Sequence, residues 1–403
     1  MTAQAESLIE AWKYTAKDLL LHMLPLHHIH GLVNAVFTPL LAGSSIEFLF
    51  PFNAKAVWHR LAAPFLPNKE ASSTKPITMI TAVPTIYDKL LAAHSSLDLE
   101  IRNSSRTAIS PTNLRLCISG SAALTPPTKA AWTSLSSGNV LLERYGMTET
   151  GMILSCGLDF SDRVDGSVGW PLPSVEVRLV DPETNQVIPD PDSMSSDDID
   201  HEGEVQLRGS TILSEYWKNP SATDAEFVED ENGGPRWFKT GDIAARHFVQ
   251  GSGKGSHTWA YGPMYFIRGR KSMDILKSGG EKISALEVEN ALLSLPEVSE
   301  AAVIGVPSPK WGQKIVAIVV LSPRNELSAE RSKRWGPLDM RRALRDKLAR
   351  YKIPHDLRVV PDLSRNAMGK GKTQDIYQDA TDGVQSTRRF FWKNISLGVK
   401  PWS

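Results

Sequence analysis

Four short motifs in this sequence combine glycine with side chains that can bind phosphate, a metal ion or a developing negative charge. YGMTET at 145–150 places a hydroxyl and a carboxylate directly after Tyr-Gly, and TGD follows at 240–242. GRKSMDILKSGGEKIS begins at Gly269, and RNAMGK ends at Lys370. Carboxylate oxygens suit a hard cation such as Mg²⁺, and glycine allows the backbone to approach a ligand closely. YGMTET, with glycine beside a hydroxyl and a carboxylate, is therefore a candidate ligand-binding segment.

Alternating short apolar runs and helical segments predict the α/β elements that must position these motifs. Buried strands are expected at 21–26, 77–83 and 114–120, each ending at proline or glycine. A helix is expected at 84–93, with proline at its start. The runs from Ser174 and at 202–209 alternate as strands, which predicts a small β-subdomain.

A second domain is predicted after a charged boundary at 268–274. It contains a helix at 285–295, strands at 301–307 and 314–321, and a basic helix at 340–354 that closes at Pro354. The expected division is 1–270 for a large N-terminal domain, 271–380 for a C-terminal domain of common size, and 381–403 for a disordered or misannotated tail. The first twenty residues predict an amphipathic helix with Leu8, Ile9, Trp12 and Leu19 on one face.

Composition excludes several classes of partner. Lysine plus arginine (45) equals aspartate plus glutamate (45), so no global charge attracts nucleic acid or an anionic membrane. No apolar stretch approaches the roughly 20 residues that span a bilayer. The N-terminus is not typical of a signal peptide, and the C-terminal PWS is not a peroxisomal address. The two cysteines, Cys117 and Cys156, are expected to be buried apolar residues in a reducing compartment.

The four motifs, in this order and spacing, resemble those of adenylate-forming enzymes, in the acyl-CoA synthetase branch and most like malonyl-CoA synthetases. The resemblance covers roughly Leu20 to Tyr377. It implies a large α/β domain with a small β-subdomain, joined by a hinge to a small α+β domain. It also implies an ATP-dependent acid:CoA ligase that forms an acyl-AMP intermediate and uses ATP, Mg²⁺ and coenzyme A.

The resemblance gives the YGMTET residues and Lys370 the central chemical roles. Tyr145 and Gly146 would form a tight turn against the nucleotide, Thr148 would contact phosphate, and Glu149 would hold Mg²⁺. Lys370 would be the catalytic lysine that stabilises charge during adenylation, although a lysine in such a loop is otherwise solvent-exposed and inert.

Further nucleotide contacts are implied upstream and downstream. Gly120, Ser121 and Ala122 follow a strand, at the edge where α/β sheets bind ligands, and would line the adenine and the acyl group. Asp242 and Arg270 would bind the ribose hydroxyls.

The segment after Arg270 resembles the hinge about which the C-terminal domain turns between the two half-reactions. Ser272 stands where the family usually has aspartate or lysine. Gly279 and Gly280 would border the channel for the pantetheine of coenzyme A.

His28 and His30, in the HHIHG segment, and Arg144 match the acyl pocket of the family. A guanidinium and an imidazole would be left without partners against a fatty tail, whereas a second carboxylate would pair with them. Malonate, methylmalonate or another short diacid is therefore expected, with a medium-chain or aromatic acid as the alternative. His30 could instead be a core histidine satisfied by its neighbours, and Arg144 could pair with Glu143 or another acid.

Two further segments complete the expectations. GSGKGS at 251–256 lacks the spacing of a phosphate loop and predicts an enlarged surface hairpin. Family members carry a Ser/Thr/Gly-rich phosphate loop upstream of the segment matching residues 1–20, but the first glycine here is Gly31. We therefore expect a truncated synthetase, either because the gene model is truncated or because the product is a genuine short form. A genuine short form would fold weakly and show little or no adenylation, or would be an inactive fragment that serves as a binding module. An intracellular compartment, cytoplasmic or mitochondrial, is expected.

Overall fold

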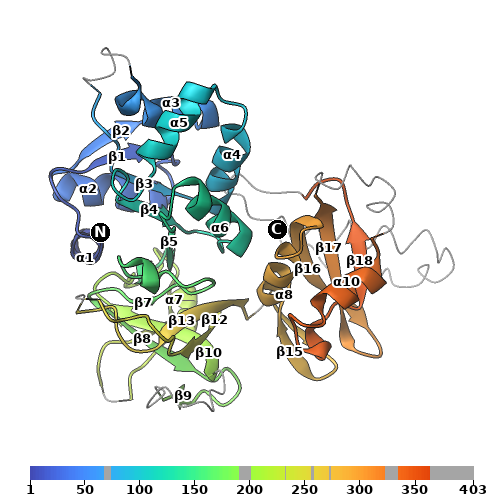
Figure 1. The fold of residues 1–403 in the computed structure, drawn as a ribbon. Helices are drawn as coiled ribbons and strands as arrows, with labels where there is room; N and C mark the ends of the chain where they lie inside the picture. The colour runs from blue at the N-terminus through green and yellow to red at the C-terminus, as the bar shows by residue number, and fades with distance from the viewer. Residues whose placement is uncertain are drawn as a thin grey trace. The chain divides into compact units, whose positions relative to one another are not determined.

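The computed structural model describes residues 1–67, 74–189, 201–231, 233–255, 258–271, 274–322 and 335–363. Lys370, Ser272 and the segment 381–403 lie outside the described residues. Contacts divide the chain into two compact units, Met1–Ile275 and Leu276–Ser403 (Figure 1).

A seven-stranded sheet forms the centre of the first unit, in the order β2-β1-β3-β4-β5-β6-β7. Strands β1 to β5 pair in parallel, and β6 and β7 add in antiparallel fashion. The strands are β1 (Leu19–His22), β2 (Ser45–Phe48), β3 (Met79–Ala82), β4 (Leu116–Ser119), β5 (Leu142–Met147), β6 (Gly151–Ser155) and β7 (Trp170–Pro171). The strand expected at 21–26 was placed too late: β1 begins at Leu19 and ends before Pro25, which cannot donate a ladder hydrogen bond.

Helices cover this sheet in two groups. Helices α3 to α6 lie together in Figure 1, apart from α1 and α2. The helical segments are α1 (Thr2–Trp12), the π-helix η1 (His30–Phe37), α2 (Thr38–Leu41), α3 (Ala54–Ala62), η2 (Ala63–Phe65), α4 (Pro84–His94), α5 (Leu99–Ala108), α6 (Pro126–Leu135) and η4 (Phe160–Asp162).

The two groups pack differently. Trp58 of α3 and Tyr87 of α4 both contact Trp132 of α6, so aromatic rings hold these helices together. Leu8 and Trp12 of α1 are fully buried against the strands. The N-terminal helix is therefore as predicted, except that it ends at Trp12 and leaves Leu19 in β1.

An antiparallel six-stranded sheet forms the predicted small β-subdomain. Its path is β11-β12-β10-β8-β9, and β13 pairs with β12. The elements are β8 (Val175–Val180), β9 (Val187–Ile188), β10 (His201–Gly209), α7 (Pro220–Glu226), β11 (Phe227–Val228), β12 (Trp237–His247) and β13 (Met264–Arg270).

The second unit is an α+β arrangement, in which helices pack on a five-stranded sheet. Its elements are β14 (Ile275–Ser278), β15 (Glu281–Ser284), α8 (Ala285–Leu293), β16 (Val298–Ser308), β17 (Gly312–Leu321), α10 (Pro337–Leu344), η6 (Arg350–Lys352) and β18 (Asp356–Val359). The single helix expected at 340–354 is wrong, because α10 ends at Leu344. Pro354 disfavours helix at the residue before it, and Lys352 Nζ binds the Glu287 carboxylate of α8 at 2.8 Å.

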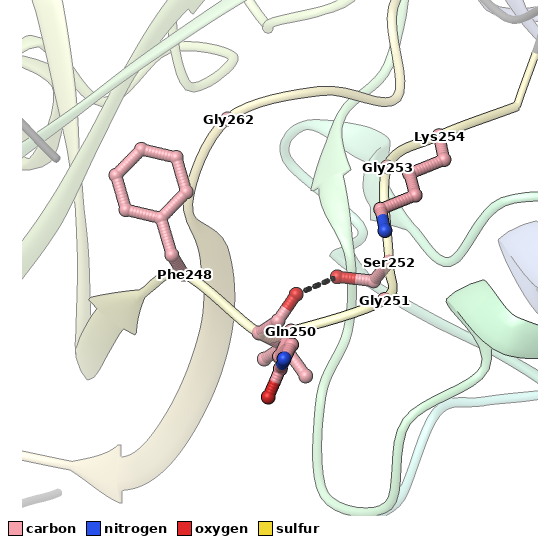
Figure 2. Close-up of a pocket in the computed structure, with 8 residues that line it drawn as sticks. Phe248, Gln250, Gly251, Ser252, Gly253, Lys254 and Gly262 are labelled. Atoms are coloured by element: carbon pink, nitrogen blue, oxygen red, sulfur yellow. Dashed lines mark hydrogen bonds between the residues drawn. The ribbon is translucent and has the colours of Figure 1, made fainter. Parts of the chain in front are cut away.

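The GSGKGS segment lies in the connection between β12 and β13, as the hairpin prediction required. Figure 2 shows the small hollow that its described residues line, with Ser252 Oγ donating to the Val249 carbonyl at 2.8 Å. The Gly253 amide donates to Asp162 Oδ1 at 2.8 Å. The Gly253 amide is therefore already hydrogen-bonded to a carboxylate of this chain, whereas a phosphate loop leaves such amides free for its ligand.

Two expectations about the whole chain also have structural outcomes. Cys117 and Cys156 are both buried free thiols. Within the described ranges, every helix is too short or too polar to cross a bilayer.

Candidate active site

Residues at the carboxyl ends of the central parallel strands meet at one edge of the seven-stranded sheet. β3 provides Thr81, and β4 ends immediately before Gly120 and Ser121. β5 provides Arg144, and the π-helix after β1 begins with His30. This edge is where open α/β sheets usually bind ligands, and π-helical segments are frequent at functional sites.

A chain of hydrogen bonds joins these side chains. Arg144 Nη2 lies 3.3 Å from Ser121 Oγ, which lies 3.2 Å from His30 Nδ1. The other ring nitrogen, His30 Nε2, lies 2.5 Å from Thr81 Oγ1. Ser121 reaches both neighbours from a left-handed backbone conformation, with φ of 67°. A non-glycine residue in this conformation stores backbone strain of the kind found at functional sites.

The donors in this chain can be assigned from the chemistry of the groups. Arginine only donates, so the Ser121 hydroxyl accepts from Arg144 and can donate its own hydrogen to His30 Nδ1. The Nε2–H of a neutral imidazole then donates to Thr81. Burial, followed by the nearby Arg144, holds the pKa of His30 well below its usual value, which favours this neutral form. His30 is fully buried and both ring nitrogens are engaged, so its hydrogen bonds match the alternative of a satisfied core histidine.

Arg144 is a buried cation without a carboxylate partner among the residues that the structure describes. Arg144 is only 3% exposed. Its Nε has no hydrogen-bond partner among the described residues. Burial lowers the pKa of Arg144 to about 9, which still leaves the guanidinium charged at neutral pH. An uncompensated buried charge is costly, so this site favours an added anion.

Gly120 and Glu143 explain how the guanidinium is held. A Cβ at Gly120 would lie 2.5 Å from Arg144 Cζ, so only glycine leaves room for the guanidinium. Glu143 does not pair with Arg144, as one alternative had it. Its carboxylate binds Lys129 Nζ of α6 at 2.9 Å.

The hairpin from β5 to β6 carries Thr148 and Glu149 in its turn. Thr148 is exposed and Glu149 is half-buried. The Leu213 amide donates to the Glu149 carbonyl at 2.8 Å, and the Tyr216 hydroxyl lies 3.5 Å from Glu149 Oε1. The hairpin therefore presents a hydroxyl and a carboxylate together near solvent.

The expected Tyr-Gly turn is wrong, because Tyr145 and Gly146 lie in β5 itself. Gly146 is needed for a different reason: a Cβ there would clash with the Gly151 carbonyl across the hairpin. The turn comes later, after Met147.

Asp242 and Arg270 meet as sequence analysis expected. They are opposite each other in the β12–β13 ladder, with Arg270 Nε 3.3 Å from Asp242 Oδ1. The Tyr145 hydroxyl donates to Asp242 Oδ2. Residues from β5, β12 and β13 thus form one polar cluster that includes a carboxylate acceptor.

The remaining expected residues are placed separately. His28 is half-buried and its Nδ1 accepts from the His30 backbone amide at 3.2 Å. Ala122 is half-buried in the loop after β4. Gly279 and Gly280 form the β14–β15 turn of the second unit, with φ of 62° and 91°.

Thr81 and Tyr216 were missed by sequence reasoning. The signal for Thr81 was one of two threonines, Thr78 and Thr81, in the mainly apolar run at 77–83. Nothing in the sequence pattern distinguished Tyr216.

The β5–β6 hairpin carries an oxygen ligand that a hard cation could use. No group of three or more histidine, cysteine, aspartate or glutamate side chains in the described ranges could hold a metal ion. Mg²⁺ is commonly bound through one or two carboxylates plus substrate phosphates. Glu149 provides such a carboxylate.

Comparison with known proteins places the two units in one family. Residues 1–217 match the AMP-binding enzyme model, and residues 287–370 match the AMP-binding enzyme C-terminal domain model. A CoA ligase of Gibberella moniliformis is 52% identical over 99% of this chain and 68% of its own length. Malonate–CoA ligase ACSF3, mitochondrial, of Bos taurus is 38% identical over 93% of this chain and 59% of its own length.

Solved structures show the same likeness. The crystal structure of ATP-bound MatB from Rhodopseudomonas palustris superposes with a TM-score of 0.73 and 30% identity, covering 94% of this chain and 64% of that one. The chain therefore spans about three fifths to two thirds of the length of these relatives. With its fold, its motifs and both family models in agreement, this chain belongs to the AMP-binding enzyme family.

Proposed function

We propose that this chain provides the catalytic core of an ATP-dependent acid:CoA ligase that acts on malonate or a related short dicarboxylate. The observation that carries the proposal is Arg144, a buried guanidinium with no carboxylate partner among the described residues. A substrate with a second carboxylate compensates that charge, whereas an apolar acyl chain leaves it unpaired. The malonate–CoA ligases among the relatives support the same choice.

In the first half-reaction, a carboxylate oxygen of the acid attacks the α-phosphorus of ATP and pyrophosphate leaves, giving an acyl-adenylate. Thr148 binds phosphate oxygens in this proposal, and Glu149 is the protein ligand for Mg²⁺. The metal ion, when bound, neutralises charge on the phosphates. Asp242 accepts hydrogen bonds from the ribose hydroxyls, with Arg270 holding the carboxylate in place.

The acyl end is fixed by the side chains at the sheet edge. Arg144 binds the distal carboxylate, and the reactive carboxylate lies towards the nucleotide. His30 acts indirectly, because its ring orients the Ser121 hydroxyl. Gly120, Ala122 and His28 complete the proposed lining, together with Tyr145 and Gly146 on the nucleotide side.

In the second half-reaction, the thiol of coenzyme A attacks the acyl carbon, AMP leaves, and the thiol proton passes to solvent or base. The proposal keeps Gly279 and Gly280 at the pantetheine channel, Ser272 at the hinge and Lys370 as the adenylation lysine. These four assignments rest on motif resemblance, and Ser272 and Lys370 lie outside the described residues.

The proposal names a class of substrate, the short dicarboxylic acids, and an intracellular location. Malonate and methylmalonate both carry the required second carboxylate. The Bos taurus, Mus musculus and Homo sapiens relatives are named mitochondrial, and for this chain we propose an intracellular location, cytoplasmic or mitochondrial.

The test is acid-dependent AMP formation by the purified 403-residue chain with ATP, Mg²⁺ and coenzyme A. Malonate, methylmalonate, acetate and octanoate are compared at equal concentrations. We expect malonate or methylmalonate to give the highest rate. Preference for octanoate would contradict the dicarboxylate assignment, and no AMP with any acid would indicate an inactive binding module.

A further inference from the structure

The first helix contacts the β5–β6 hairpin through the side chain of Gln4. Gln4 Oε1 accepts from the Met152 backbone amide at 2.6 Å, across 148 residues of sequence. Gln4 is only 3% exposed, on the buried face of α1. The Met152 amide is the second backbone N–H of β6, two residues after the turn at 148–150 that carries Thr148 and Glu149.

Gly151 shows how closely this side chain fits the hairpin. Its φ of 71° is in the left-handed region that favours glycine. A Cβ at Gly151 would also clash with Gln4 Oε1. The hairpin backbone therefore bends around the Gln4 amide, and any side chain at this position would displace one or the other.

Other contacts of α1 reach the body of the first unit but not this turn. Ser7 Oγ donates to the Pro173 carbonyl at 2.7 Å, beyond the end of β7. Trp12 Nε1 donates to Ser155 Oγ at 2.9 Å, at the far end of β6. Among these three contacts, Gln4 alone meets the hairpin beside its turn.

We propose that Gln4 is a positioning residue, which fixes the β5–β6 turn so that Thr148 and Glu149 face the nucleotide. This inference rests on the proposed function for the roles of those two residues. Neither Oε1 nor Nε2 of Gln4 is hydrogen-bonded to Thr148 or Glu149. Gln4 acts on them through the backbone of Met152. For comparison, removing a hydrogen bond that orients a metal ligand directly costs about 10- to 100-fold in metal affinity or activity.

An uncharged amide suits this position better than a carboxylate. The acceptor oxygen must face the Met152 N–H, so the Nε2 group points elsewhere. Nε2 is buried and has no hydrogen-bond partner among the described residues. A glutamate here would place a buried negative charge beside a turn that must receive phosphates.

The experiment compares Gln4→Met with Ser7→Ala in the full 403-residue chain. Gln4→Met keeps the side-chain length and removes the acceptor, while Ser7→Ala removes a hydrogen bond from the same helix to a different element. Hydrogen exchange of peptides covering 147–153 is measured by mass spectrometry. ATP–pyrophosphate exchange with malonate, and thioester formation from preformed malonyl-adenylate, are measured on the same samples.

For Gln4→Met we expect hairpin exchange to accelerate at least tenfold and the KM for Mg·ATP to rise at least fivefold. Thioester formation from malonyl-adenylate should stay within twofold, because it needs no triphosphate. Ser7→Ala should stay within twofold in all three measurements. A merely structural role would slow both half-reactions together.

Three results would overturn the inference. They are wild-type hairpin exchange in Gln4→Met, faster exchange with an unchanged KM for Mg·ATP, or equal effects in Ser7→Ala. If Gln4→Met does not fold, Gln4→Asn replaces it, because it keeps a neutral amide but is one methylene too short to reach the Met152 N–H. Its hairpin should exchange faster, and wild-type protection in Gln4→Asn would overturn the inference. If the wild-type chain is inactive with every acid, the proposed function fails while hairpin exchange still decides on Gln4.

Discussion

Glu143 and Arg144 are neighbours on β5, and both are buried, yet only Glu143 has an ion-pair partner among the described residues. The Glu143 carboxylate lies 2.9 Å from Lys129 Nζ, with both side chains less than a tenth exposed. Lys129 also binds Asp165 at 3.2 Å. Arg144 has a serine hydroxyl at 3.3 Å and no carboxylate in the part of the chain that the structure describes.

This difference separates a structural charge from one available to a ligand. Consecutive residues of a strand point to opposite faces, so Glu143 faces α6 and Arg144 faces the sheet edge that holds Ser121. Removing one partner of a buried pair leaves an uncompensated charge. Arg144 already carries the free-energy cost of a buried charge without a counter-ion, and a bound carboxylate would offset this cost. Removing a charge on the Glu143 side of β5 should therefore lower the free energy of unfolding strongly, whereas removing Arg144 should change it little.

The largest effect on stability is expected from Lys129→Met. It leaves Glu143 buried without its cation, and the free energy of unfolding should fall by about 3–5 kcal/mol. Urea denaturation followed by circular dichroism measures the change. Lys129→Met combined with Glu143→Leu removes both charges and should recover most of the loss. A decrease below about 1 kcal/mol for the single variant would mean that the pair is not structural.

A smaller, pH-dependent effect is expected from His30. Its pKa in the folded state is well below the usual value, whereas an unfolded histidine titrates near 6.5. Above about pH 6.5 both states are neutral, and below it only the unfolded state binds the proton. The free energy of unfolding should therefore fall as the pH is lowered from about 6.5, by up to about 1.4 kcal/mol per pH unit.

His30→Gln should reduce that slope by the contribution of one histidine. The measurement is the urea midpoint between pH 7.5 and 5. His27→Gln, at an exposed position three residues earlier, is the matched control and should leave the slope unchanged. An unchanged slope in His30→Gln would show that the imidazole is not held neutral.

The smallest effect on stability is expected from Arg144→Met. The substitution removes a buried cation that lacks a carboxylate, so the free energy of unfolding should stay within about 1 kcal/mol of the wild type or increase. A loss as large as that of Lys129→Met would place Arg144 among the structural charges instead. The comparison of the two sides of β5 would then fail.

Sequence reasoning predicted the parts of this site that are recorded in local motifs. The strand before Gly120, the pairing of Asp242 with Arg270, and the proximity of His30 to Arg144 all follow from motif order in a known family. The small β-subdomain followed from alternating apolar residues. These features depend on residues that are close in sequence or share an expected fold.

Other features depend on contacts that no local pattern records. The hydrogen bonds of Thr81 to His30 and of Gln4 to Met152 join residues 51 and 148 positions apart. Gly146 was expected in a turn, but the reason for glycine there is the opposing carbonyl of Gly151. The basic helix ends early at Leu344, and Lys352, which was expected inside it, instead binds the Glu287 carboxylate of α8.

We propose that Arg144 selects a dicarboxylate, and the substrate specificity of Arg144→Met tests this role most directly. The measurement is kcat/KM for malonate and for acetate in the wild type and in Arg144→Met, by AMP formation. Truncating one partner of a buried charge pair costs about 2–5 kcal/mol, so malonate kcat/KM should fall about 100-fold or more while acetate changes less than threefold. Equal losses for both acids, or retained preference for malonate, would contradict the account.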